Sequence, residues 1–109
     1  MEQSVLASRK SNTTCTGEPF DEQTVEAVWN KGGVIPGYHP DYFRRDACGA
    51  AMLKTAYGIM GDFGWEIDHI RPVAKDGTDD LDNLQPMHWR NNRKKGDDSP
   101  HWACAVISP

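Results

Sequence analysis

Residues 65–72 read Trp-Glu-Ile-Asp-His-Ile-Arg-Pro, and residues 83–97 read Asn-Leu-Gln-Pro-Met-His-Trp-Arg-Asn-Asn-Arg-Lys-Lys-Gly-Asp. The first stretch predicts a β-strand. Pro72 donates no backbone hydrogen bond and restricts the residue before it to extended geometry, so the strand is expected to stop at about Ile70. These two stretches contain the residues on which fold and function depend.

The segment between the two stretches predicts a loop. Lys75-Asp76-Gly77 is a turn signal, and the polar run continues through Asp82, so a return strand is expected to begin at Asn83. Residues 89–97 contain no proline and are rich in cations, which predicts a short basic helix that ends at Gly96. Its basic residues are Arg90, Arg93, Lys94 and Lys95.

The residue types in these stretches suit hydrolysis of a phosphodiester. The reaction needs a base to activate water, a hard cation at the phosphate and cationic groups along the backbone. His69 can act as the base, and Asp68 and Asn92 offer the carboxylate and amide oxygens that Mg²⁺ accepts. Neighbours on a regular strand point to opposite faces, so Asp68 and His69 are expected to lie where the strand ends.

The chain closely resembles the HNH endonucleases, also called ββα-metal or His-Me finger nucleases. The resemblance is carried by Gly-Trp-Glu-Ile-Asp-His-Ile at 64–70 and Asn-Leu-Gln-Pro at 83–86, and it extends from about Val28 to Asp97. It implies a small α+β protein built on the ββα-metal motif, with an additional N-terminal helix. The core motif spans residues 64–97.

The resemblance also implies a role for each residue of the motif. His69 matches the general base, and Asp68 before it matches a metal ligand. Asn83 matches the middle Asn, which braces the loop and helps to orient the base. Asn92 matches the third position, where the family has a His or Asn ligand. Lys95 matches a lysine common at the end of the helix, for which a phosphate contact is expected.

The remaining predicted contacts involve the basic helix and His88. Arg93 is expected to steady the nucleic-acid backbone together with Lys95, and Arg90 and Lys94 add to the same cationic surface. His88 lies close to Asn92 in sequence. It is expected to pack or to make a hydrogen bond in support of the site, with direct contact to the metal or phosphate as the alternative.

Cysteine content bears on metals and on compartment. Many HNH proteins carry two Cys pairs that bind a structural zinc, but this chain has no Cys-x-x-Cys, so no structural zinc is expected. Cys15, Cys48 and Cys104 are widely scattered and predict no disulfide framework, and three free thiols point to the cytoplasm. The expected cofactor is one divalent cation, Mg²⁺ in the first place, with Mn²⁺ and Ni²⁺ as alternatives.

Length and charge bound the class of partner. With 109 residues, a formal net charge of −4 and no run of eighteen apolar residues, neither a nucleic-acid coat protein nor a membrane-spanning protein is expected. A small basic cleft on an acidic body suits transient contact with DNA. Double-stranded DNA is the first expectation, with single-stranded DNA and RNA open, and no small-molecule cofactor is indicated.

The rest of the chain predicts one domain with a tail. Residues 1–17 are polar without apolar periodicity and are expected to form a flexible N-terminal tail, and residues 18–109 the domain. Asp21 is expected to cap a helix that runs to about Lys31 and stops at Gly32-Gly33. Residues 48–53 are ambiguous between a helix and a strand, and we interpret them as a strand beside residues 65–70.

The sequence thus predicts a metal-dependent HNH endonuclease that cuts DNA. Two alternatives stay open. One is a non-catalytic nucleic-acid-binding module that keeps a relic of the HNH site. The other is the nuclease domain of an antibacterial toxin, for which an inhibitor protein would be the partner.

Overall fold

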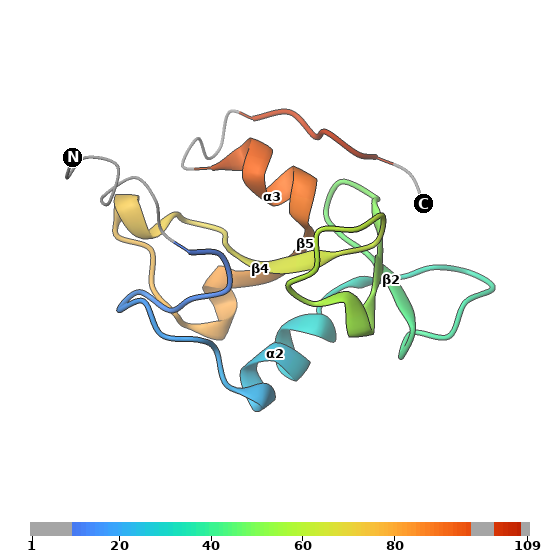
Figure 1. Cartoon of the computed structure of the whole chain (residues 1–109), viewed down its shortest axis with the longest axis horizontal. Helices are drawn as coiled ribbons and strands as arrows, with labels where there is room; N and C mark the ends of the chain where they lie inside the picture. The colour runs from blue at the N-terminus through green and yellow to red at the C-terminus, as the bar shows by residue number, and fades with distance from the viewer. Residues whose placement is uncertain (1–9, 97–101, 108–109) are drawn as a thin grey trace.

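The computed structural model describes residues 10–96 and 102–107. At its centre lies an antiparallel hairpin of β4, Trp65–His69, and β5, Leu84–His88. Helix α3, Trp89–Lys95, contacts one side of the hairpin, and helix α2, Glu22–Trp29, contacts the other (Figure 1). Two strands followed by a helix are the arrangement that the motif predicts, so the α+β fold is confirmed.

The hairpin follows the predicted boundaries closely. β4 ends at His69, one residue before the expected end, and the next backbone N–H, of Ile70, donates to Asn83 O at 2.7 Å. The register runs from Trp65 opposite His88 to His69 opposite Leu84. The loop between the strands contains two short 3₁₀ turns, η2 at Val73–Lys75 and η3 at Leu81–Asn83.

A second sheet lies in the first half of the domain. It has the order β1 (Gly33–Val34), β2 (Phe43–Arg45), β3 (Ala51–Leu53), and all its pairs are antiparallel. The short 3₁₀ turn η1, Lys54–Ala56, follows β3.

The sequence-based expectation for residues 48–53 is correct in type and wrong in partner. β3 pairs with β2 and not with β4. The strand also begins late, because Gly49 adopts a φ of 93° and Asp46 Oδ1 accepts hydrogen bonds from the backbone N–H groups of Cys48 and Ala50. These contacts form a loop where the strand was expected to start.

Helix α2 begins as predicted. The Asp21 side chain accepts a hydrogen bond from Thr24 N at 2.8 Å, which caps the helix. Hydrogen bonding with the side chain and the backbone of Thr24 lowers the pKa of the Asp21 carboxyl. The helix ends at Trp29, two residues earlier than expected. It contributes Val28 and Trp29 to the core, whose other buried members are Met52, Trp65, Ile67 and Leu84.

The prediction of three free thiols is wrong. Cys48 and Cys104 form a disulfide whose Cα atoms lie 5.9 Å apart, across 56 residues of sequence. Sequence spacing did not indicate the pair, because the two cysteines are distant in the sequence and meet only in the folded protein. The cysteine content therefore no longer supports the predicted cytoplasmic location.

The same region is held by a buried side-chain network. Asp46 Oδ2 accepts hydrogen bonds from His88 N at 2.9 Å and from Asn91 Nδ2 at 3.0 Å. Asn91, which is fully buried, bonds in turn with the backbone of Ala105 and Val106. The disulfide and this network fix the segment after α3 to the loop before β3.

Removal of the disulfide should lower stability substantially. Closing a loop of this length constrains the unfolded chain, so we expect Cys104→Ser to reduce the free energy of unfolding by about 2–4 kcal/mol. Urea denaturation of the oxidised wild type and of the variant measures the effect. Equal midpoints would contradict the disulfide, and Cys15→Ser serves as the control that leaves it intact.

Residues 10–17, which composition predicts to belong to a tail, lie against the domain. Asn12 Oδ1 accepts a hydrogen bond from Ile67 N at 2.7 Å, and Thr13 forms a bridge with Pro19. Residues 1–9 lie outside the described part of the chain. Within the described ranges, no helix combines the length and apolar character needed to cross a membrane.

Candidate active site

Asp68 lies between β4 and α3, with both carboxylate oxygens engaged. Lys95 Nζ donates to Asp68 Oδ1 at 3.0 Å and to His69 O at 2.9 Å, and Gln85 Nε2 donates to Asp68 Oδ2 at 2.9 Å. Asp68 is 4% exposed and Lys95 is 2% exposed. A buried ammonium that is paired with Asp68 is not presented to a phosphate, so we assign Lys95 to Asp68 in place of the predicted phosphate contact.

The surroundings of Asp68 act on its protonation in two directions. Burial raises the pKa of the Asp68 carboxyl above its ordinary value, while the hydrogen bond from Gln85 and the charge of Lys95 oppose that rise. The carboxylate therefore depends on cationic and hydrogen-bonding neighbours to stay ionised.

Asn92 contacts a different carboxylate of the same strand. Asn92 Nδ2 donates to Glu66 Oε1 at 2.8 Å, and Arg93 Nη2 donates to Glu66 Oε2 at 2.9 Å. Asn92 and Lys95, which are three residues apart, thus share a helix face and meet strand positions 66 and 68. Glu66 was not among the predicted residues, although its place two residues before Asp68 puts it on the same strand face.

His69 lies on the opposite side of β4. Its Nε2 is 2.9 Å from Asp79 Oδ1, and its ring lies 5.9 Å from the ring of Phe20. Since both Asp68 and His69 are paired within the ladder, the strand pleat points them to opposite faces. Asp68 and His69 are therefore the last two residues of β4, but their side chains lie on opposite faces of the strand.

Asp79 was not among the predicted site residues. Burial alone would raise the pKa of its carboxyl, but hydrogen bonds from His69 and Cys15 outweigh that effect and lower it. An ionised Asp79 can accept a hydrogen bond from a protonated Nε2 of His69. This arrangement leaves Nδ1 as the basic nitrogen of the ring. A carboxylate that orients an imidazole in this way prepares it to act as a base.

Asn83 braces the loop that carries Asp79. Its Oδ1 accepts from Arg71 N at 2.8 Å, and its Nδ2 donates to Thr78 O at 2.8 Å and to Arg71 O at 3.1 Å. Gly77 fits this loop because a Cβ there would lie 1.7 Å from Arg71 O. Asn83 thus helps to fix the loop from which Asp79 contacts His69.

His88 has a structural environment. It is 1% exposed, its Nε2 is 2.8 Å from Asp62 O, and its Nδ1 accepts from Arg90 N at 3.1 Å, which caps α3. These contacts occupy both ring nitrogens in packing and capping.

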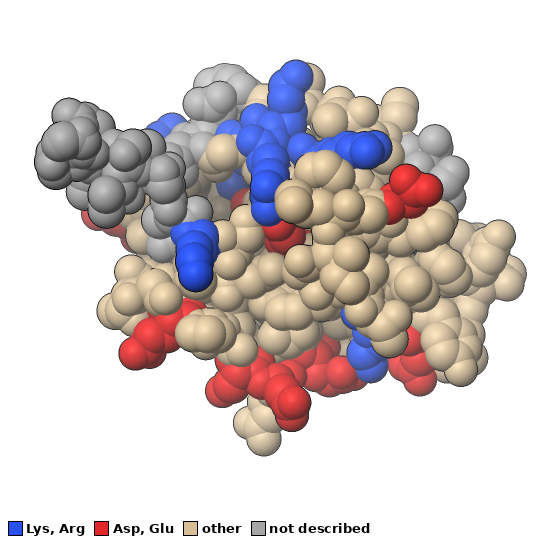
Figure 2. Space-filling model, viewed as in Figure 1, with Lys and Arg blue, Asp and Glu red and all other residues tan. Residues whose placement is uncertain are grey.

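The cations of α3 form an exposed surface. Arg90 and Arg93 lie over the Trp89 ring at 5.0 and 5.7 Å from its centroid, and Lys94 is exposed beside them. Figure 2 shows Lys and Arg gathered at the upper edge, on the α3 side, and Asp and Glu along the lower edge around α2. We call Arg90, Arg93 and Lys94 the basic surface of α3.

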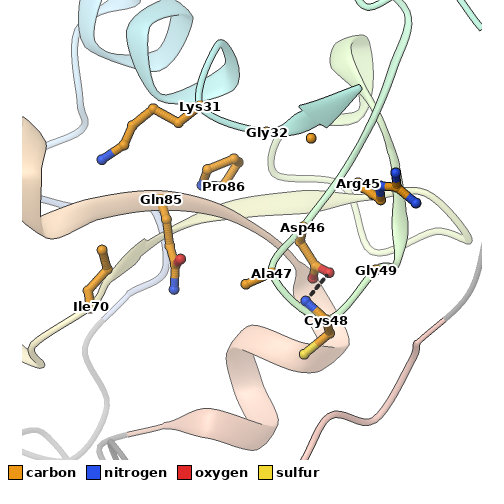
Figure 3. Close-up of a pocket in the computed structure, with 11 residues that line it drawn as sticks. Lys31, Gly32, Arg45, Asp46, Ala47, Cys48, Gly49, Ile70, Gln85 and Pro86 are labelled. Carbon is orange, nitrogen blue, oxygen red and sulfur yellow. Dashed lines mark hydrogen bonds between the residues drawn. The ribbon is translucent and has the colours of Figure 1, made fainter. Parts of the chain in front are cut away.

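A cleft of about 530 Å³ lies next to the hairpin (Figure 3). Lys31 after α2, the loop from Arg45 to Gly49, Ile70 and Gln85 contribute to its lining. Because Gln85 also donates to Asp68, the cleft adjoins the site on that side of the sheet.

The donors on the α3 side fit a hard cation. Asp68 and Glu66 offer carboxylate oxygens and Asn92 an amide oxygen, which are ligands that Mg²⁺ prefers. The Lys95 ammonium at 3.0 Å from Asp68 Oδ1 shows that a positive charge is accommodated against this carboxylate. The residues present are therefore suited to a divalent metal ion.

Comparison with known proteins identifies a family for the second half of the chain. Residues 48–98 match the model of the family described as HNH endonuclease. No curated protein and no solved structure matches the chain. The matched segment contains β3, the β4–β5 hairpin, α3 and every residue predicted for the site.

Proposed function

Because residues 48–98 match the HNH endonuclease family, we propose that this chain is a metal-dependent endonuclease that hydrolyses phosphodiester bonds in DNA. The observation that carries the proposal is the hydrogen bond between His69 and Asp79 at 2.9 Å. His69 follows directly after Asp68, whose carboxylate is buried. This hydrogen bond orients the imidazole at the last residue of β4, next in sequence to Asp68.

In the proposed reaction His69 takes the proton of the attacking water. Asp79 holds Nε2, so Nδ1 is the atom that receives the proton, and the ionised carboxylate stabilises the imidazolium that forms. Asn83 keeps the Asp79 loop in place during this step. A divalent cation, for which Mg²⁺ is our proposal, would be held by Asp68 and Asn92 and would neutralise charge at the phosphate.

Lys95 and Gln85 position Asp68. Their hydrogen bonds to the two carboxylate oxygens fix its orientation and favour its ionised form. The contact of Lys95 with His69 O also ties the helix end to the last residue of β4. The ammonium thus supports the ligand and the base together.

The basic surface of α3 is our candidate for the DNA backbone contact. Arg90 and Lys94 are exposed and lie four residues apart on one helix face, while Arg93 forms an ion pair with Glu66. Cations in this arrangement bind phosphates without reading bases. We therefore propose weak, sequence-independent binding through this helix.

Loss of these cations should change the salt dependence of binding. Each phosphate contact contributes about 0.9 to the slope of log affinity against log salt concentration, so Arg90→Ala with Lys94→Ala should lower the slope by about 2. Fluorescence anisotropy with duplex DNA in Mg²⁺-free buffer measures it. Lys54→Ala, which removes a cation paired with Glu26 near α2, should leave the slope unchanged. An unaltered slope in the double variant would place the contact elsewhere.

Supercoiled plasmid tests the activity directly. Protein stripped of metal with a chelator is incubated with the plasmid and Mg²⁺, Mn²⁺ or no metal. We expect nicked or linear product only when a divalent cation is present. Absence of cleavage with plasmid, single-stranded DNA and RNA alike would overturn the proposal.

One observation favours a second candidate, a nucleic-acid-binding module with a relic site. Asp68 is already paired with Lys95 inside the protein, so its charge is balanced without a metal. This candidate predicts that the protein retards DNA in a gel and leaves it uncut with Mg²⁺ and Mn²⁺.

A further inference from the structure

A second group of potential metal ligands lies on the His69 side of β4. Cys15, His69 and Asp79 each direct one ligand atom to a common place, and these atoms lie within 4.8 Å of one another. They come from the N-terminal segment, the end of β4 and the loop after η2. Among the residues that the structure describes, these are the three His, Cys, Asp or Glu side chains that could hold a metal ion together.

The backbone around these residues is fixed independently of any ion. Cys15 N donates to both carboxylate oxygens of Asp79, at 3.0 and 3.1 Å, and Cys15 Sγ donates to Gly77 O at 3.3 Å. The loop that carries Asp79 is held by Asn83 and by the close approach of Gly77 to Arg71. The three side chains are therefore presented by a prearranged scaffold.

We propose that Cys15, His69 and Asp79 form a binding site for a thiophilic divalent cation such as Zn²⁺. Sulfur, imidazole nitrogen and carboxylate oxygen bind zinc at about 2.0 to 2.3 Å, which puts tetrahedral ligands about 3.5 Å apart. Shifts of about 1 Å bring the three atoms to that spacing. Cys15 and Asp79 are exposed, so an ion and a water as fourth ligand have access.

The two sides of β4 thus differ in metal preference. The donors on the α3 side are oxygens, which suit Mg²⁺, whereas a thiolate and an imidazole select zinc. A cation bound among these three ligands replaces the hydrogen bond between His69 Nε2 and Asp79, which the proposed reaction uses to orient the imidazole. Zinc at this site therefore inhibits cleavage, a consequence that rests on the proposed function, whereas the binding itself does not.

Cobalt provides the direct test, because Co²⁺ replaces Zn²⁺ and reports a sulfur ligand by its charge-transfer absorption. The chain has three cysteines, and Cys48 and Cys104 are joined, so such a band assigns Cys15. We expect the oxidised full chain to bind one Co²⁺ with this band and to release it to one equivalent of Zn²⁺. In Cys15→Ala, which keeps the backbone hydrogen bonds to Asp79, the band should vanish and zinc affinity should fall at least about tenfold.

The control variant is His39→Ala, which removes an exposed imidazole far from these ligands in sequence. It should bind zinc and cobalt as the wild type does. Absence of the band in the wild type, or equal zinc affinity in wild type and Cys15→Ala by calorimetry, would overturn the site.

Inhibition is measured separately. With Mg²⁺ present, stoichiometric Zn²⁺ should stop plasmid cleavage by the wild type and leave Cys15→Ala active. Equal inhibition of both proteins would overturn the regulatory consequence. If neither protein cuts in Mg²⁺ alone, the proposed nuclease function fails, and the cobalt band still decides whether the metal site exists.

Discussion

His69→Ala should fold like the wild type and cut plasmid about 10²- to 10⁴-fold more slowly, the usual effect of losing a general base. The expectation rests on the hydrogen bond to Asp79, which leaves one ring nitrogen to accept the proton of water. Initial rates of nicking under saturating Mg²⁺ measure the loss, and circular dichroism checks that the fold persists.

Two controls separate a base from a structural residue. His39→Ala, at an exposed imidazole, should cut at the wild-type rate. Added imidazole should restore part of the activity of His69→Ala, because a small base can enter the space left by the side chain, and it should not restore Asp68→Ala. A His69→Ala protein that cuts at the wild-type rate would refute the assignment.

Lys95→Met should lower the free energy of unfolding by about 3–5 kcal/mol, because it leaves the buried carboxylate of Asp68 without its counter-charge. This is among the largest effects expected of a single substitution in a small domain. Urea denaturation monitored by tryptophan fluorescence measures it.

The neighbouring lysine is the matched control. Lys94 is exposed, and Lys94→Met should change the free energy of unfolding by less than about 0.5 kcal/mol. Replacing both partners, with Asp68→Asn and Lys95→Met, should recover part of the lost stability because no unpaired charge remains. If Lys95→Met were as stable as Lys94→Met but bound DNA more weakly, Lys95 would be a phosphate contact, as the family resemblance implies.

Local sequence signals were sufficient for the elements of the motif. Pro72, the polar loop and the basic run ending at Gly96 predicted the strand, return strand and helix within one or two residues of the observed bounds. These signals work because turns, caps and breakers act over a few residues. The spacing of three residues between Asn92 and Lys95 indicates a shared helix face, and the structure shows that this face contacts β4.

Local sequence signals did not predict the contacts between segments that are distant in the sequence. Whether the ammonium of Lys95 meets Asp68 or a phosphate depends on how α3 packs against the strand, and spacing gives the face but not the depth of burial. The partner of His69 is supplied by a loop ten residues later, and the partner of Cys48 lies 56 residues away. No periodicity encodes either pair, since each depends on the path of an irregular segment.

The Cys48–Cys104 bond turns the greater part of the domain into a covalently closed ring. β3, the hairpin, α3 and every predicted residue of the site lie on the ring, while α2 and the N-terminal segment lie outside it. A protease that cuts once between residues 49 and 103 produces two pieces that stay in one molecule until a reductant separates them. A single cut before residue 48 releases the preceding segment from its covalent link at once.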